Sequence, residues 1–131
     1  MAQLTQAQSA KIRGLLEERY KELVARVRDE LARSDEEQVA ALANRVRDAG
    51  DESVVDLVDT LGAAIVDRQL GELREIERAR KRLEAGEINT CVECGDEIGF
   101  QRLAASPTAV RCVRCQEHYE KTHAGTGNSR L

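Results

Sequence analysis

Apolar residues recur at intervals of three, four or seven along residues 7–47, and this spacing predicts one amphipathic helical stripe. The stripe consists of Ile12, Leu16, Leu23, Val27, Leu31, Val39, Leu42 and Val46. It falters at residues 32–38, where Ser34 and the acids after it favour either a helix interruption or a new helix start with a capping acid. We expect one helix with a weak point there, and Thr5 and Ser9 are candidate N-caps for its beginning.

Residues 48–53 interrupt this pattern before a second stripe begins. Gly50 suits a left-handed helix end, and Asp51 and Ser53 suit the start of the following helix. The second stripe consists of Val54, Val58, Leu61, Ile65, Leu73, Ile76 and Leu83, and it ends at Ala85 and Gly86. Two helices of this length joined by so short a turn must lie antiparallel to bury both stripes. The sequence therefore predicts a mostly α fold, with a long antiparallel coiled-coil hairpin over residues 9–86.

The composition fits such a hairpin better than a broad globular core. Aromatic residues make up 2% of the 131 residues and charged residues make up 34%, which suits a narrow apolar seam. The net charge of −4 argues against sequence-specific DNA binding, because phosphate contact needs a clustered basic surface. We therefore expect a protein partner. We also expect the chain to be a monomer. No apolar run approaches the roughly 20 residues of a membrane span.

Two Cys-x-x-Cys pairs, Cys91 with Cys94 and Cys112 with Cys115, carry the clearest chemistry in the chain. Two such knuckles supply the four thiolates that tetrahedral zinc prefers, and four sulfur ligands leave no coordination position open. We therefore expect one structural zinc ion per chain. Gly95 suits the tight turn after the second sulfur. The alternatives are two disulfides or a redox dithiol, and both are disfavoured because the chain shows neither a secretion signal nor a βαβ pattern. Reduced cysteines and the missing signal predict a cytoplasmic location.

The predicted zinc finger and a short C-terminal helix occupy residues 87–123, between the hairpin and a tail that we expect to be disordered, residues 124–131. Residues 1–8 are polar, and we expect a flexible N-terminus. His118 and His123 are interpreted as ordinary residues of the short helix. Three basic residues lie near enough in sequence to offset the negative charge of a zinc ion with four thiolates: Arg102, Arg111 and Arg114.

The residues around the cysteines resemble the C4-type zinc finger of the DksA/TraR family, and the resemblance extends over about residues 45–120. The matching positions are Cys91-x-x-Cys94-Gly95, Ile98-Gly99, Arg102-Leu103, Ala105, Pro107-Thr108-Ala109 and Cys112-x-x-Cys115-Gln116. Proteins of this family are bacterial transcription regulators that bind RNA polymerase instead of DNA and insert a coiled-coil hairpin through its secondary channel. The resemblance implies this function, with no enzymatic activity of the chain's own.

The turn at residues 48–53 resembles the family's tip motif, Asp-x-x-Asp-x-Ala. Here the motif reads Asp48-x-x-Asp51-x-Ser53, so both acids match and serine replaces alanine. The resemblance implies that Asp51, and then Asp48, act on the mobile catalytic elements of the polymerase. The alternative is that these acids only cap and solubilise a turn.

Two other functions remain open from the residues. A Gre-type stimulator of transcript cleavage also works through a coiled-coil tip, where acids such as Asp51 and Glu52 help to hold Mg²⁺; the zinc finger argues against it. A zinc-ribbon adaptor would bind nucleic acid or protein through the finger, but single-strand binders usually offer aromatic platforms beside a basic groove.

The family's site for guanosine tetraphosphate uses basic residues at three positions. These positions align with Glu75, Ser106 and Gln116. A tetraphosphate-bearing nucleotide needs cations or preorganised donors, so we expect this alarmone not to bind at these positions. The alternative is that Arg74, Arg78 and Arg111 rebuild a site from neighbouring positions.

Overall fold

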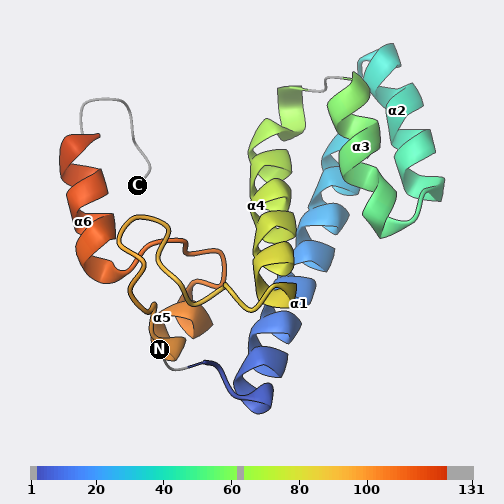
Figure 1. Cartoon of the computed structure of the whole chain (residues 1–131). Coiled ribbons are helices and arrows are strands. Elements are labelled where there is room, and N and C mark those ends of the chain that lie inside the picture. Colours follow the sequence, from blue (N-terminus) through green and yellow to red (C-terminus); the bar gives the residue numbers. More distant parts are fainter. Residues whose placement is uncertain (1–2, 62–63, 124–131) are drawn as a thin grey trace. The chain divides into compact units, whose positions relative to one another are not determined.

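Helices dominate the computed structural model, which describes residues 3–61 and 64–123. Its elements are α1 (Gln6–Ala32), α2 (Glu37–Asp48), α3 (Asp51–Leu61), the 3₁₀ turn η1 (Ala64–Val66), α4 (Asp67–Glu84), α5 (Phe100–Ala105) and α6 (Val113–Thr122) (Figure 1). Within the described residues there is no extended strand, only an isolated antiparallel bridge between Thr90 and Glu97. None of the helices described is both long and apolar enough to cross a membrane. The predicted mostly α fold is confirmed.

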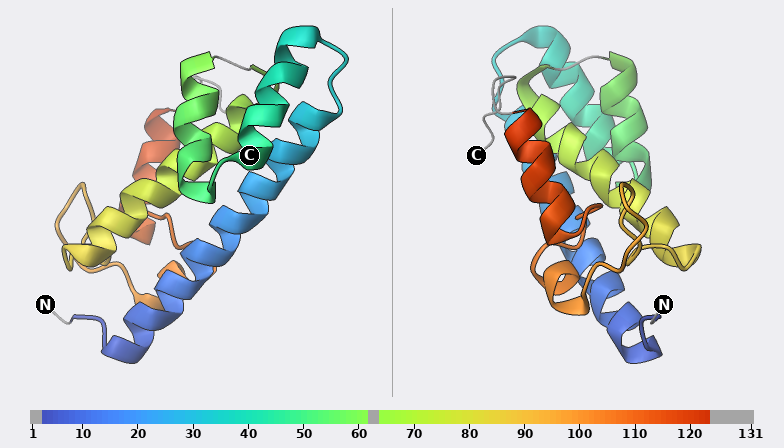
Figure 2. Two further views of the ribbon diagram at one scale, coloured as in Figure 1. Left: turned by 90° about the vertical axis from the view of Figure 1, so that its right-hand side faces the viewer. Right: turned by 60° about the vertical axis from the view of Figure 1, so that its left-hand side comes forward.

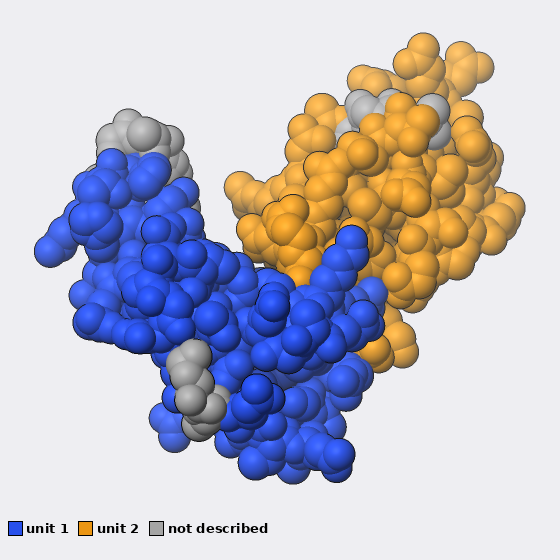
Figure 3. Space-filling view, viewed as in Figure 1, with its two compact units in different colours: residues 1–13, 79–131 blue, residues 14–78 orange. Residues whose placement is uncertain are grey.

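The chain divides into two compact units, which Figure 3 shows in different colours. One unit is formed by residues 1–13 and 79–131 and contains the four cysteines. The other is formed by residues 14–78 and contains most of α1, all of α2, α3 and η1, and the first part of α4. The predicted disordered tail, residues 124–131, lies outside the described residues.

The ends of the first helix follow from local side chains. Thr5 caps α1, since its Oγ1 accepts the backbone N–H of Gln8 at 3.0 Å and the Gln8 side chain accepts the N–H of Thr5 at 3.0 Å. The prediction of one helix with a weak point at residues 32–38 was wrong, because the chain forms two helices there: α1 ends at Ala32, and α2 begins at Glu37. In the gap, Ser34 Oγ accepts the N–H of Glu36 at 3.2 Å. Acids oppose the dipole at the end of α1 but suit the beginning of α2.

Within residues 14–78, α1 and α4 run antiparallel and side by side (Figures 1 and 2). Arg19 Nε donates to Glu72 Oε2 at 2.7 Å, and Gln69 donates to Glu30 at 3.1 Å. Earlier residues of α1 therefore meet later residues of α4. The pairing that the two apolar stripes predict is present between these helices.

The second helix pair, α2 with α3, folds back against α1. Arg28 Nη2 donates to the carbonyl oxygen of Ala49 at 2.8 Å, although 21 residues of one straight helix would separate them by about 32 Å. Arg74 of α4 also pairs with Asp59 of α3. The predicted long hairpin is thus divided: both of its helices are interrupted, and the turn at residues 48–53 lies beside α1. Helix α3 ends directly before Gly62, a residue of low helix propensity.

The helical stripes supply the core of residues 14–78. Its buried apolar residues are Leu16, Tyr20, Leu23, Val24, Val27, Leu31, Leu42, Val46, Val54, Val55, Val58, Val66, Leu70, Leu73 and Ile76. The prediction was wrong for Ile65, which is 54% exposed, because η1 turns Val66 inward in its place. Val39 and Leu83 are half-buried, and the side chain of Leu61 lies outside the described residues.

Helices α4 and α2 end in different ways. Helix α4 ends in a Schellman motif: Gly86 has φ of +76°, and the N–H of Glu87 donates to the carbonyl of Arg82 at 2.8 Å. Helix α2 has no such glycine. The prediction of a left-handed Gly50 was wrong, since among the described residues positive φ occurs only at Gly86 and Gly95. The chain leaves α2 through Ala49 in an extended conformation.

Replacing two glycines near or within α4 should shift stability in opposite directions. A Cβ at Gly71 or at Gly86 would meet no atom within 4 Å. Gly71→Ala, inside the helix, should stabilise the protein by about 0.5–1 kcal/mol, whereas Gly86→Ala should destabilise it by about 1 kcal/mol because of its positive φ. Urea denaturation of the zinc-saturated protein measures both. A stabilising Gly86→Ala would contradict the Schellman ending.

Candidate metal centre and acidic tip

The four cysteine sulfurs converge on one point. All four Sγ atoms lie within 4.8 Å of one another, Cys94 and Cys112 are 3.8 Å apart, and all four thiols are free. A tetrahedron with zinc–sulfur bonds of about 2.3 Å has edges of about 3.8 Å. The cluster therefore fits one zinc ion with Cys91, Cys94, Cys112 and Cys115 as ligands, and the sulfurs are not paired as the disulfide alternative requires.

The first knuckle is shaped by a tight turn. The N–H of Gly95 donates to the carbonyl of Cys91 at 3.0 Å, and φ of +78° at Gly95 confirms the predicted turn glycine. The turn directs the N–H of Asp96 toward Cys94 Sγ at 3.4 Å. Burial opposes ionisation of Cys91, yet the backbone N–H groups of Cys94, Cys112 and Glu93 donate to its sulfur and lower its pKa to about 6. Backbone donors thus favour thiolate at the first ligand.

The second knuckle leads directly into α6. Cys112 is the N-cap of this helix, and the backbone N–H of Cys115 lowers the pKa of the Cys112 thiol. Burial, together with its three sulfur neighbours, raises the pKa of Cys115 to about 12. Four thiolates at this separation repel one another, so a divalent cation is needed for all four to ionise.

Backbone and arginine contacts hold the two knuckles together. The N–H of Val92 donates to the carbonyl of Val110 at 2.9 Å, which joins the knuckles directly. Arg82, in the last turn of α4, donates to the carbonyl of Thr90 at 2.9 Å. The chain therefore enters the first knuckle from a fixed helix end.

The three arginines that lie near the cysteines in sequence also make contacts around the zinc finger in the structure. Arg102 donates to the carbonyl of Arg111 at 2.9 Å, and Arg111 in turn pairs with Glu93 at 3.3 Å. Arg114 pairs with Asp96 at 2.9 Å. The Asp96 hydrogen bond, and then the charge of Cys112, raise the pKa of Arg114. The arginines thus contact acids and carbonyls around the finger, and Arg114 also lies within the electrostatic reach of the sulfurs.

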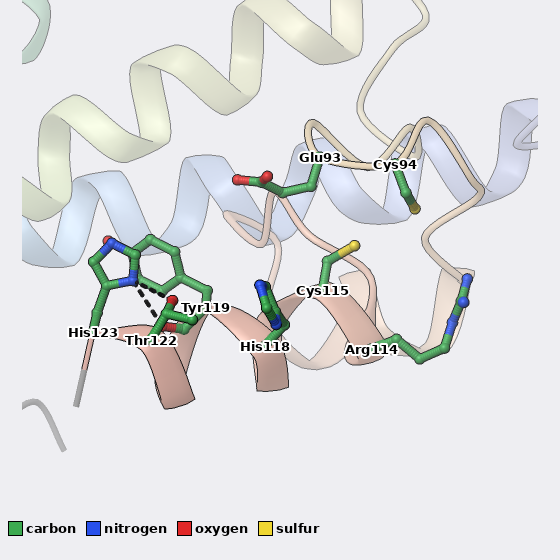
Figure 4. Close-up of a pocket in the computed structure, with 8 residues that line it drawn as sticks. All are labelled: Glu93, Cys94, Arg114, Cys115, His118, Tyr119, Thr122 and His123. Carbon is green, nitrogen blue, oxygen red and sulfur yellow. Dashed lines mark hydrogen bonds between the residues drawn. The ribbon is translucent and has the colours of Figure 1, made fainter.

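A pocket of about 350 Å³ lies beside the cluster (Figure 4). Its lining residues are Glu93, Cys94, Arg114, Cys115, His118, Tyr119, Thr122 and His123. The His123 ring stacks on Tyr119 with 3.9 Å between ring centroids, and its Nδ1 lies 2.8 Å from the Tyr119 carbonyl oxygen. Among the described residues, neither His118 nor His123 belongs to the group of ligand atoms that converge within 4.8 Å.

The three tip residues lie around the α2–α3 turn in different environments. Asp48 is the last residue of α2, and its side chain is 81% exposed. Asp51 is the first residue of α3 and is half-buried, while Ser53 is exposed in the first turn of that helix. The structure brings these residues to one turn, and it adds a neighbour that the sequence did not indicate: Arg28 of α1 donates to Asp51 Oδ1 at 3.0 Å.

Sequence reasoning missed Arg28 because the contact depends on tertiary structure. Arg28 lies 23 residues before Asp51 in a charged, amphipathic helix with many other arginines and acids. Spacing within a helix reveals only partners three or four residues apart. No pattern in the sequence singles this arginine out.

The three positions at which the resemblance implies an alarmone site, Glu75, Ser106 and Gln116, carry no positive charge. Glu75 is exposed on α4, and Ser106 is exposed after α5. Gln116, on α6, donates to Glu120 at 3.0 Å.

Known proteins resemble the chain in both finger and helices. The family model of the prokaryotic dksA/traR C4-type zinc finger matches residues 81–121. The RNA polymerase-binding transcription factor DksA of Caulobacter vibrioides is 31% identical over 107 residues, covering 79% of this chain and 75% of that protein. The protein of the same name from Escherichia coli K12 is 40% identical over 62 residues, 45% of this chain and 41% of its own length. The solved structure of transcription factor DksA2 from Pseudomonas aeruginosa has a TM-score of 0.58 at 31% identity, with 91% of this chain and 88% of that chain covered.

Purified protein should contain about one zinc ion per chain, and Cys112→Ser should reduce this content strongly. Removing one of four thiolates opens the coordination shell, and structural zinc contributes folding free energy directly. Elemental analysis measures the zinc content. Val113→Ala is the matched control, because Val113 is the adjacent residue and is 54% exposed.

A native protein that contains disulfides and no zinc would contradict this prediction. Equal zinc content in the Cys112→Ser variant and the control would show that Cys112 is not a ligand.

Proposed function

The chain belongs to the DksA/TraR family of C4 zinc-finger proteins, and on this premise we propose that it regulates transcription by binding RNA polymerase. The supporting observation is the breadth of the similarity to the Caulobacter RNA polymerase-binding factor, which covers 79% of this chain and so includes helices as well as finger. The cysteine cluster agrees with it, since the family's finger and the converging sulfurs both indicate one structural zinc ion.

Each part of the chain has a role in this proposal. Cys91, Cys94, Cys112 and Cys115 hold zinc and fix the fold of the finger, and their closed set leaves no position for a substrate. The helices carry the acidic tip into the secondary channel of the polymerase, where Asp48, Asp51 and Ser53 act near the catalytic centre. The protein itself catalyses no reaction and works in the cytoplasm, where its partner transcribes.

In this proposal the polymerase contacts the DNA, and the chain does not. With a net charge of −4, the chain lacks the overall positive charge that supports binding through phosphates. Regulation then proceeds through the enzyme at the promoter, without sequence-specific recognition by the chain.

Binding to core RNA polymerase tests the proposal most directly. The purified, zinc-loaded chain should bind the polymerase and compete with another factor that occupies the secondary channel. It should change transcription from sensitive promoters without stimulating cleavage of backtracked RNA. Absence of binding would favour an adaptor function for the finger, and stimulated cleavage would favour a Gre-type function.

Asp51→Asn should weaken regulation far more than it weakens polymerase binding. One carboxylate at a turn contributes little interface area, so its loss should weaken polymerase binding only slightly. Loss of the charge-assisted hydrogen bond that this carboxylate makes should reduce regulation of transcription by about tenfold. We expect such a loss in a promoter assay, with a dissociation constant changed by less than about threefold. Asp56→Asn, at an exposed acid of the same helix, is the matched control and should change neither quantity.

Equal loss of regulation and binding in Asp51→Asn would show that the tip is a binding anchor. If the variant regulates as well as the wild type does, Asp51 only serves the turn.

The protein should act independently of guanosine tetraphosphate. The aligned positions Glu75, Ser106 and Gln116 lack the cations that a polyphosphate requires, and charge-assisted hydrogen bonds contribute about 1.5–3 kcal/mol each. Transcription with a polymerase that lacks its own separate alarmone site measures the dependence. A clear further response to the nucleotide that requires this protein would refute the prediction.

A further inference from the structure

Arg28 makes three hydrogen bonds to the α2–α3 turn. Its Nε donates to the carbonyl of Val46 at 3.2 Å, its Nη2 to the carbonyl of Ala49 at 2.8 Å, and its Nη1 to Asp51 Oδ1 at 3.0 Å. The side chain is 30% exposed, and its neighbour Val27 is fully buried. Arg28 thus lies at the edge of the apolar face of α1, with its guanidinium group against the turn.

The end of α2 lacks the local means of termination found in α4. The last carbonyl groups of a helix have no partner within it and carry the negative end of its dipole. In α4 the Gly86 motif satisfies them, whereas α2 leaves through Ala49 in an extended conformation with one weak backbone hydrogen bond, 3.3 Å, to Val46. Arg28 supplies the missing donors, and its positive charge adds to that of Arg45 and Arg47 in the last turn of α2.

The same guanidinium group orients one of the two tip acids and not the other. Asp51 begins α3, where a negative charge is favourable, and its carboxylate contacts Arg28 at 3.0 Å. Asp48 is 81% exposed, and its ion-pair partner is Arg47 at 3.9 Å, itself 69% exposed. Arg28 therefore distinguishes the two acids, although the motif treats them as a pair.

We propose that Arg28 is a positioning residue of the tip: by bridging the end of α2 and the Asp51 carboxylate, it fixes the geometry in which the acids are presented to the polymerase. The proposal rests on the proposed function for its effect on transcription. The contact itself belongs to the free protein and is tested separately.

The planar fork of arginine suits this role. Three acceptors, two carbonyl oxygens and one carboxylate oxygen, are reached by three different nitrogens of one rigid group. A lysine at this position keeps the positive charge but concentrates its donors on one atom. Arg28→Lys therefore separates the need for charge from the need for geometry.

Nuclear magnetic resonance of the free, zinc-loaded protein tests the contact. The Arg28 Nε–H should exchange with water more slowly than that of Arg26, which is exposed on the same helix. Its resonance should shift in Asp51→Asn and stay in place in Asp48→Asn. Fast exchange like that of Arg26, or an equal response to both substitutions, would overturn the proposed contact.

Promoter and binding assays then test its effect. Arg28→Met and Arg28→Lys should each lose about tenfold in regulation with polymerase affinity within about threefold, while Arg26→Met stays at the wild-type level. Adding Arg28→Met to Asp51→Asn should lower regulation by less than a further twofold or so, because the two residues act as one unit. Wild-type regulation by Arg28→Met, or losses that multiply in the double variant, would overturn the positioning role.

These outcomes are distinct from failure of the proposed function. If the wild-type chain does not bind polymerase, the proposed function falls, and the resonance measurements still decide the Arg28 contact. If Arg28→Met does not fold by circular dichroism, the Arg28→Lys variant and those measurements decide the proposal instead.

Discussion

The convergence of four sulfurs within 4.8 Å is the contact on which the fold of residues 87–123 depends. This segment buries only three large apolar side chains, those of Ile88, Ile98 and Leu103. Burying such side chains contributes about 1.5–3 kcal/mol each, whereas structural zinc in small fingers contributes about 10–16 kcal/mol. Zinc binding therefore contributes more to the stability of this segment than its apolar core does. The turns at Gly95 and before α6 bring the zinc ligands together.

Residues 14–78 are stabilised by different means. Fifteen apolar residues are buried there, and polar contacts decide which helix lies against which. Arg19 pairs with Glu22 on its own helix and with Glu72 on α4, and Glu72 and Glu22 raise the pKa of Arg19. The pair is partly exposed and adds little to stability.

How much the sequence predicted depended on how local each feature is. The turn at Gly95 and the Thr5 cap are set by residues within a few positions, and both are confirmed. The cysteine cluster joins two pairs that are far apart in sequence, and it was predictable because zinc prefers four thiolate ligands. Most stripe residues are buried, since helical periodicity is also local. The exposure of Ile65 was missed, because η1 turns Val66 inward in its place. The division of the hairpin and the conformation of Gly50 were missed, because they depend on how the α2–α3 pair packs against α1. Arg28 was missed for the same reason.

Asp48 and Asp51 lie in different environments, and this difference helps to decide whether the tip acids only cap a turn or also contact a partner. Asp51 begins a helix and meets Arg28, so the capping interpretation accounts for its position. Asp48 ends α2, where a carboxylate faces the negative end of the helix dipole, and it is 81% exposed. Arg45 and Arg47 in the same turn supply the favourable charge that Asp48 opposes. The fold therefore gives Asp48 no stabilising role, and the proposed contact of the tip with the polymerase would give it one.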